Sequence, residues 1–238
     1  MIIGEYILKS KFYIYICINK INEDMKNVFF KPWVGKNYLS TGIDGKKLLV
    51  LGESHYCGEN CPTCGKLEVD DKNCREFTTN VVNGYLKYKK GDSEFEGWMN
   101  TFTKFGNVFY NKHLGLEEVQ AFWNSIVFYN FVQSSTNGPR ESPTAEEFTK
   151  SASAFFEVLK SYKPDLIIVW GERLWKQLPD TGEWGKEETI FNKENKRPFY
   201  YYTSDQKKIP TFSVFHPSSS RFDYSCYEPI HKAINYLP

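Results

Sequence analysis

Four short stretches rich in branched and aromatic residues stand out in the pattern of hydrophobic and polar positions along the chain. The stretches are Lys47–Gly52, Phe122–Asn130, Asp165–Gly171 and Ile209–Phe215. The first is apolar at every position between its lysine and its glycine, which is typical of a strand covered on both faces. Each stretch ends at, or just before, a glycine or a polar residue. We therefore predict four buried strands at the centre of the fold.

Segments with helical features separate these strands. Thr144 and Glu147 form a capping box, which predicts a helix that runs to Lys163-Pro164. Apolar residues recur at three- and four-residue spacing between Trp98 and Tyr110, although Gly106 interrupts them. Further helices are expected at 75–87 and 172–178. Strands that alternate with helices pair in parallel, so the fold class is α/β: a three-layer α/β/α fold with a central four-stranded parallel sheet.

Length and composition favour a single domain. The chain has 238 residues and a formal net charge of +1, which neither indicates nor excludes a nucleic-acid partner. We assign residues 26–238 to the domain and residues 1–25 to an N-terminal extension. Its apolar run Phe12–Ile18 is too short to span a membrane, and no small-residue cleavage site follows it. We expect a monomer in the cytoplasm, with no membrane association.

Cysteines are concentrated in a loop at 56–74. The four residues of this group are Cys57, Cys61, Cys64 and Cys74. Without a secretion signal, a metal site is favoured over a disulfide framework. The local spacing favours a closed structural zinc site, with an iron–sulfur cluster and free thiols as the alternatives. The remaining two cysteines, Cys17 and Cys226, are isolated.

Polar side chains follow the predicted strands at the points where they end. They are Glu53, Ser54, His55, Tyr56, Asn130 and His216, together with Gly171. The carboxyl ends of parallel strands lie at one edge of a sheet, and ligands bind in the crevice there. These residues are therefore expected to share one site.

Two strand-end motifs resemble those of the uracil-DNA glycosylase superfamily. Gly52–Tyr56 is similar to its first motif, which reads Gly-Gln-Asp-Pro-Tyr-His in one branch and Gly-Glu-Ala-Pro-Gly in the thermostable iron–sulfur branch. The segment 216–220 reads His-Pro-Ser-Ser-Ser and is similar to the second motif, His-Pro-Ser-Pro-Leu-Ser. Asn130–Gln133 and Lys163–Gly171 follow the layout of the iron–sulfur branch between them. The resemblance covers about residues 47–220 and implies a uracil-DNA glycosylase-like fold.

The resemblance implies base recognition and DNA contact. In the superfamily, a flipped base enters a pocket that reads its edge. By this resemblance Asn130 would read the base, with His55 and Tyr56 beside it, and Tyr56 would exclude the methyl group of thymine. His216 would stabilise the charge that develops on the departing base. The segment Ser218, Ser219, Ser220 and Arg221 would contact the DNA backbone, with Arg221 at a phosphate or Phe222 as a wedge.

Two positions in the first motif depart from the superfamily pattern. Ser54 stands where one branch has the aspartate that activates water or stabilises the sugar cation. Glu53 matches the carboxylate of the iron–sulfur branch and could take this role, so Glu53, Ser54 and His216 are the catalytic candidates. His55 replaces a proline and adds a titratable group.

The leading hypothesis is a DNA glycosylase-like hydrolase of base-excision repair. It would cleave the N-glycosidic bond of a flipped base, uracil first, in single- or double-stranded DNA. One alternative is a catalytically weak or inactive module of the same fold that binds a nucleobase, nucleotide or nucleic acid. Another is a hydrolase for a different damaged base, such as hypoxanthine.

Overall fold

The computed structural model describes residues 25–57, 72–136, 138, 141–186, 190–192 and 195–237 of the chain. The predicted extension 1–25 therefore lies outside the described residues except for Met25. That residue is buried against the core and belongs to the domain. Most of the cysteine-rich loop predicted at 56–74 also lies outside the described part of the chain.

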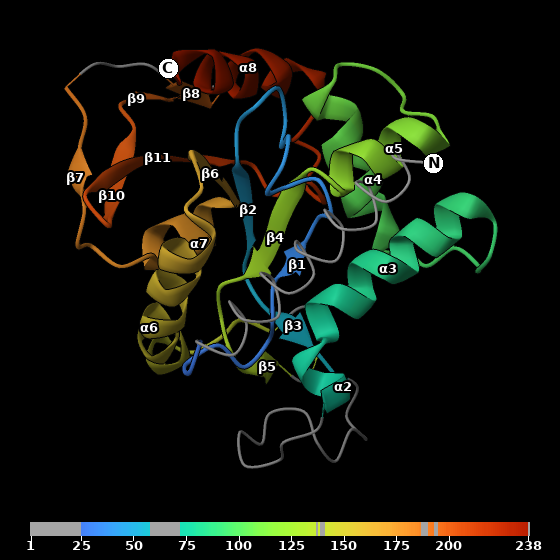
Figure 1. Cartoon of the computed structure of the whole chain (residues 1–238), viewed down its shortest axis with the longest axis horizontal. Helices are drawn as coiled ribbons and strands as arrows, with labels where there is room; N and C mark the ends of the chain where they lie inside the picture. Colours follow the sequence, from blue (N-terminus) through green and yellow to red (C-terminus); the bar gives the residue numbers. More distant parts are fainter. Residues whose placement is uncertain are drawn as a thin grey trace, which may run out of the picture.

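A seven-stranded mixed sheet forms the centre of the fold, in the order β1-β4-β2-β6-β11-β10-β7 (Figure 1). Its strands are β1 (Trp33–Val34), β2 (Leu48–Gly52), β4 (Ile126–Asn130), β6 (Leu166–Trp170), β7 (Glu183–Trp184), β10 (Tyr200–Ser204) and β11 (Lys207–Val214). The neighbours β4, β2, β6 and β11 are parallel, as predicted. The sheet is larger than the predicted four strands, because β1, β10 and β7 add antiparallel edges.

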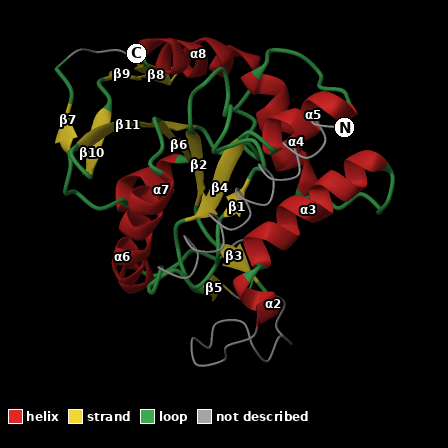
Figure 2. Ribbon diagram, viewed as in Figure 1, coloured by secondary structure: helices red, strands yellow, loops and turns green. Residues whose placement is uncertain are grey.

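Helices cover both faces of this sheet (Figure 2). They are α2 (Lys72–Arg75), α3 (Phe77–Lys90), α4 (Met99–Phe109), α5 (Leu116–Trp123), α6 (Ala145–Tyr162), α7 (Glu172–Gln177) and α8 (Tyr227–Tyr236). Successive side chains of a strand point to opposite faces. Accordingly, Leu48 and Val50 pack in a core with residues of α3, α4, α5 and α8, whereas Leu49 and Leu51 pack in a second core with α6 and α7. The protein is therefore an α/β protein with three layers.

Shorter elements lie outside the central sheet. They are β3 (His55–Tyr56), β5 (Ser135–Thr136), β8 (Ile190–Asn192), β9 (Asn195–Arg197) and the 3₁₀ helix η1 (Tyr224–Cys226). β3 and β5 pair in parallel with each other. This pairing holds the two loops that leave the carboxyl ends of β2 and β4 against each other.

The predicted strand at 122–130 starts too early. Phe122 and Trp123 are the last residues of α5, and the strand begins at Ile126. Both side chains are buried in the helix-covered core, so aromatic content alone did not distinguish a buried helix end from a strand. The helix between Trp98 and Tyr110 is confirmed as α4, and it runs through Gly106. A Cβ at Gly106 would lie 3.2 Å from the Leu114 side chain, which explains the glycine by close packing.

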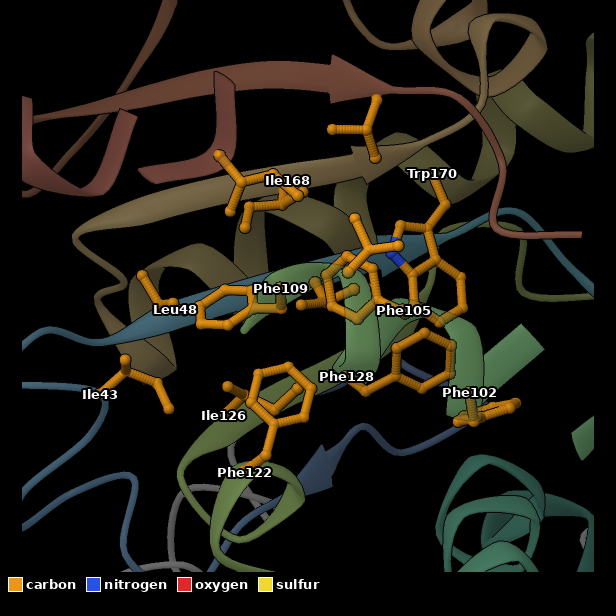
Figure 3. Packing of buried hydrophobic residues seen from close by; sticks show 14 of the residues in the cluster. Ile43, Leu48, Phe102, Phe105, Phe109, Phe122, Ile126, Phe128, Ile168 and Trp170 are labelled. Carbon is orange, nitrogen blue, oxygen red and sulfur yellow. The ribbon is translucent and has the colours of Figure 1, made fainter. Parts of the chain in front are cut away.

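Aromatic side chains fill the core on the side of α4. Phe102, Phe105 and Phe128 surround Trp170, with ring centroids 4.9–5.8 Å from its own. Figure 3 shows these rings grouped against β2, β4 and β6. Such a core is close-packed, so it fixes the strand ends that it supports. None of the helices in the described ranges is both long enough and apolar enough to cross a membrane.

Candidate functional site

A cavity opens at the carboxyl ends of the four parallel strands. The chain leaves β2 for β4 through helices on one face, and leaves β6 for β11 through α7 on the other face. This reversal makes the edge between β2 and β6 a topological switch point, where open α/β sheets form a crevice. The cavity there has a volume of about 1230 Å³.

Most of the predicted site residues line this one cavity. They are Glu53, Ser54, His55, Tyr56, Cys57, Cys74, Asn130, His216, Ser218, Ser219 and Arg221. Ser220 is exposed and does not line it. The sheet therefore brings together the residues that follow β2, β4 and β11, as the parallel arrangement predicted.

Asn130 is held at the end of β4 by its neighbours on β2 and β3. The side chain is 7% exposed. Its Nδ2 donates to the Ser54 carbonyl oxygen at 3.3 Å and lies 3.1 Å from His55 Nδ1 and 3.2 Å from His55 Nε2. A Cβ at Gly52 would lie 2.1 Å from Asn130 Oδ1. Only glycine at position 52 therefore leaves room for this orientation of the amide.

His55 is a buried residue that connects Asn130 to α3. Its Nε2 lies 2.8 Å from Thr78 Oγ1, and its ring packs against those of Phe30 and Phe77 at centroid distances of 4.9 and 4.5 Å. Burial lowers the pKa of His55 from 6.5 to about 3. The imidazole is therefore neutral at physiological pH. Tyr56, by contrast, is 43% exposed at the rim of the cavity.

Glu53 forms an ion pair with Arg173 of α7. The pair is bidentate: Arg173 Nε donates to Glu53 Oε2 at 2.7 Å, and Nη2 donates to Oε1. The hydroxyl of Ser142 accepts a further bond from Nη1. The Glu53 side chain is 11% exposed, whereas that of Arg173 is 55% exposed. The hydrogen bonds to Glu53 raise the pKa of Arg173. This geometry anchors the carboxylate between β2 and α7.

His216 carries its proton on the nitrogen that faces away from its own loop. The backbone N–H of Ser218 donates to His216 Nδ1 at 3.2 Å, and the Ser218 hydroxyl lies 2.7 Å from the same atom. A backbone N–H can only donate, so Nδ1 is an acceptor and the neutral ring has its proton on Nε2. Burial lowers the pKa of His216, Glu53 opposes this shift, and Arg173 adds to it.

The loop after His216 is fixed on α4. Lys104 donates to the Ser219 carbonyl oxygen at 2.7 Å, and the Arg221 guanidinium lies 4.3 Å from the centroid of the Phe215 ring. Phe222 is fully buried and stacks on Phe105 at 6.0 Å. The prediction of Phe222 as a DNA wedge is wrong, because this ring is part of the core. Arg221 is exposed and keeps its place among the candidate DNA contacts.

The predicted cysteine group is only partly within the described residues. Cys57 is disulfide-bonded, and Cys74 is buried. Cys61 and Cys64 lie outside the described residues. Among the residues that are described, no group of three or more histidine, cysteine or acidic side chains could hold a metal ion. The zinc site therefore stays a prediction.

Several lining residues were not predicted from the sequence. Arg173 follows the predicted strand end at Gly171, so its position at the sheet edge was a usable signal. The pairing of Arg173 with Glu53 depends on the distance between α7 and β2, and this distance cannot be predicted from the sequence. Phe77 lines the cavity from α3, and Thr78 of the same helix contacts His55. Nothing in the sequence distinguished these two from ordinary helix residues.

The fold and the cavity define an α/β protein with a strand-end site. Comparisons with protein-family models and with curated proteins found no match to this chain.

Proposed function

We propose that the protein is a DNA glycosylase-like hydrolase that removes a flipped base, uracil in the first instance, from DNA. One observation carries the proposal: Asn130, Glu53 and His216 line the same cavity at the ends of β4, β2 and β11. Together they supply a base reader, a carboxylate and a neutral hydrogen-bond donor. The resemblance of the strand-end motifs to the uracil-DNA glycosylase superfamily agrees with this set.

The cavity suits an extruded nucleotide. Its volume of about 1230 Å³ exceeds the ~300–1000 Å³ that is common for small-molecule sites. The extra space would admit the sugar together with the base. The inner wall carries the Asn130 amide among aromatic side chains, and a polar group in such surroundings discriminates strongly between hydrogen-bonding partners.

His216 would act on the departing base. During cleavage, the electron pair of the glycosidic bond moves onto the base, and negative charge develops on a base carbonyl oxygen. The Nε2–H of neutral His216 is the group that remains to donate to this oxygen. Removal of one such donor costs about 10²–10³ in rate in enzymes that stabilise an oxyanion.

Glu53 would act on the sugar and on water. Arg173 uses one lone pair of each carboxylate oxygen, and the second lone pair of each remains. The carboxylate can therefore stabilise the positive charge on the sugar and accept a proton from the attacking water. The water oxygen bonds to the anomeric carbon, the bond from that carbon to the base breaks, and the departing base takes up a proton.

The test is base release from uracil-containing single- and double-stranded oligonucleotides, followed by cleavage at abasic sites. We expect strand breaks with the wild-type protein and a rate about 10²–10³ lower for His216→Ala. The rate of base release should also be lower for Glu53→Gln than for the wild-type protein. Matched controls are His113→Ala and Glu117→Gln, which change exposed side chains outside the cavity. Intact oligonucleotides with wild-type protein would reject hydrolysis, and unchanged rates in both site variants would remove their roles.

A second candidate is a module of the same fold that binds a base or nucleotide without cleaving it. The charge of the cavity favours this alternative. Among the described lining residues are four glutamates, Glu53, Glu96, Glu141 and Glu172, against two arginines, Arg173 and Arg221. An acidic lining favours an uncharged base over a polyanion. A rise in melting temperature with uracil while oligonucleotides stay intact would support this module.

A further inference from the structure

The Asn130 amide has one unused hydrogen-bonding atom. The Ser54 carbonyl oxygen can only accept, so the amide group that faces it must be Nδ2, and this fixes the orientation of the amide. Nδ2 also lies within hydrogen-bond distance of the His55 ring. Both hydrogens of Nδ2 are therefore used within the protein.

Oδ1 of Asn130 accepts no hydrogen bond from the described residues, although the side chain is more than nine-tenths buried. It is not among the fully enclosed atoms without a partner. Since Asn130 lines the cavity, its oxygen remains accessible there. A buried acceptor without a partner favours a ligand that brings a donor to it.

His55 is responsible for this arrangement. When its ring accepts from Asn130 through Nδ1, its Nε2 carries the proton and donates to Thr78 Oγ1. Phe30, which precedes β1, and Phe77, the first residue of α3, pack against the ring. The orientation of His55, and with it the use of Nδ2, is therefore set by Thr78 and by the two phenylalanine rings.

We propose that Asn130 recognises its ligand through Oδ1 alone, as a single acceptor, and that His55 is the positioning residue that withholds Nδ2. The ligand class is then bases that present a ring N–H beside a carbonyl group. Uracil and hypoxanthine both belong to it. Asn130 does not donate a hydrogen bond to the neighbouring carbonyl oxygen of the base. An asparagine whose Nδ2 had no partner in the protein could donate such a bond. This inference rests on the proposed base-binding role of the cavity.

Binding of three free bases tests this inference without any requirement for hydrolysis. The probes are uracil, 3-methyluracil, in which the ring N–H is replaced, and 4-thiouracil, in which sulfur weakens the neighbouring acceptor. By titration calorimetry we expect 3-methyluracil to bind at least about tenfold more weakly than uracil, because a buried acceptor is left unpaired. We expect 4-thiouracil to bind within about threefold of uracil, because Asn130 does not contact that position. Equal losses for the two analogues would overturn the inference.

Variants of the positioning residues add an independent test. His55→Phe keeps an aromatic ring between Phe30 and Phe77 but frees Nδ2, so discrimination against 4-thiouracil should appear where the wild-type protein shows none. Thr78→Val removes the hydroxyl that orients His55, so the ratio of the affinities for uracil and 4-thiouracil should rise in this variant too. This variant provides the test if His55→Phe does not fold. Thr103→Val is the matched control, since its hydroxyl bonds Tyr85 outside the cavity. An unchanged ratio in a folded Thr78→Val or His55→Phe protein would reject the positioning role.

The outcomes separate this inference from the proposed hydrolysis. Intact uracil DNA combined with the expected pattern of free-base binding would reject hydrolysis and support single-acceptor recognition. Cleaved uracil DNA combined with equal losses of affinity for both analogues would support hydrolysis and reject single-acceptor recognition. Failure of all three bases to bind would reject the inference.

Discussion

The inner and outer halves of the cavity hold their polar groups in different ways. The inner half comprises Gly52, His55 and Asn130, with Thr78 bonded to His55 from outside the cavity lining. The histidine and asparagine are 4% and 7% exposed, and both are uncharged. The outer half comprises Glu53, Arg173, His216, Ser218 and Arg221. There the Arg173 side chain is 55% exposed, and the ion pair connects separate elements.

This difference indicates that the two halves have separate roles: the inner half recognises the ligand, and the outer half supplies the charged groups. Hydrogen bonds in dry surroundings are costly to leave unmade, so the inner half is suited to selecting a ligand. Charges near solvent are screened by salt and contribute little to stability, so the outer half is suited to meeting a charged or reacting group. Substitutions in the two halves should therefore differ in size and in the quantity that they change.

The largest effect should be acid destabilisation through the inner half. The folded protein keeps His55 neutral down to its pKa of about 3, whereas the unfolded chain binds a proton below about 6.5. Between these values the unfolded state holds more protons, so the free energy of unfolding falls as pH falls, by up to ~1.4 kcal/mol per pH unit. Above about pH 6.5 this contribution to stability is fully present.

Urea unfolding at a series of pH values measures this slope. His55→Phe should flatten it, because the buried ring no longer titrates. His216 contributes in the same direction and leaves some slope in the variant, since burial lowers the pKa of His216 as well. His113→Ala serves as a control at an exposed position and should keep the wild-type slope. An equally steep slope in His55→Phe would contradict the buried, neutral state of His55.

An intermediate effect is expected from Gly52→Ala. The new Cβ would lie 2.1 Å from Asn130 Oδ1, and that amide is held on its other side. Overpacking of this kind costs about 1–3 kcal/mol in the free energy of unfolding. Binding of uracil should weaken as well, since the acceptor must move. Gly97→Ala is the control, because a Cβ there meets nothing within 4 Å. If Gly52→Ala binds uracil as tightly as the wild-type protein does, Asn130 does not recognise the base.

The smallest effect on stability is expected in the outer half. Arg173→Lys keeps the positive charge but loses the bidentate contact with Glu53. Because the pair is partly exposed, its loss should change the free energy of unfolding by less than about 1 kcal/mol. The rate of base release should fall more than stability does, since Glu53 is less well oriented. Urea unfolding measures the change in stability. A large loss would contradict the comparison, because the Glu53–Arg173 pair would then stabilise the protein as much as the buried hydrogen bonds of the inner half.

Much of the fold could be predicted from local sequence patterns. The uniformly apolar β2 and β6 are strands that helices cover on both faces, and the capping box at Thr144 begins α6 as predicted. These features depend on short-range periodicity and capping. The edge strands β1 and β7 are two residues long, so they carry no periodic signal of their own.

The candidate site could be predicted in part. Strand ends that meet at one edge of a parallel sheet placed Glu53, Asn130 and His216 together in advance, and the structure has all three on one cavity. The burial of Phe222 was not predictable from its position after a serine-rich loop. It depends on Phe105, which belongs to a distant segment.

The sequence by itself determined which residues stand at the strand ends, because the alternation of apolar strands and capped helices is local information. Only the tertiary structure decided what each polar group does there. His55 became a buried support for Asn130, and Arg173 became the partner of Glu53. Hydrogen bonds act over about 3 Å, so they depend on how separate elements pack against each other and not on their order along the chain.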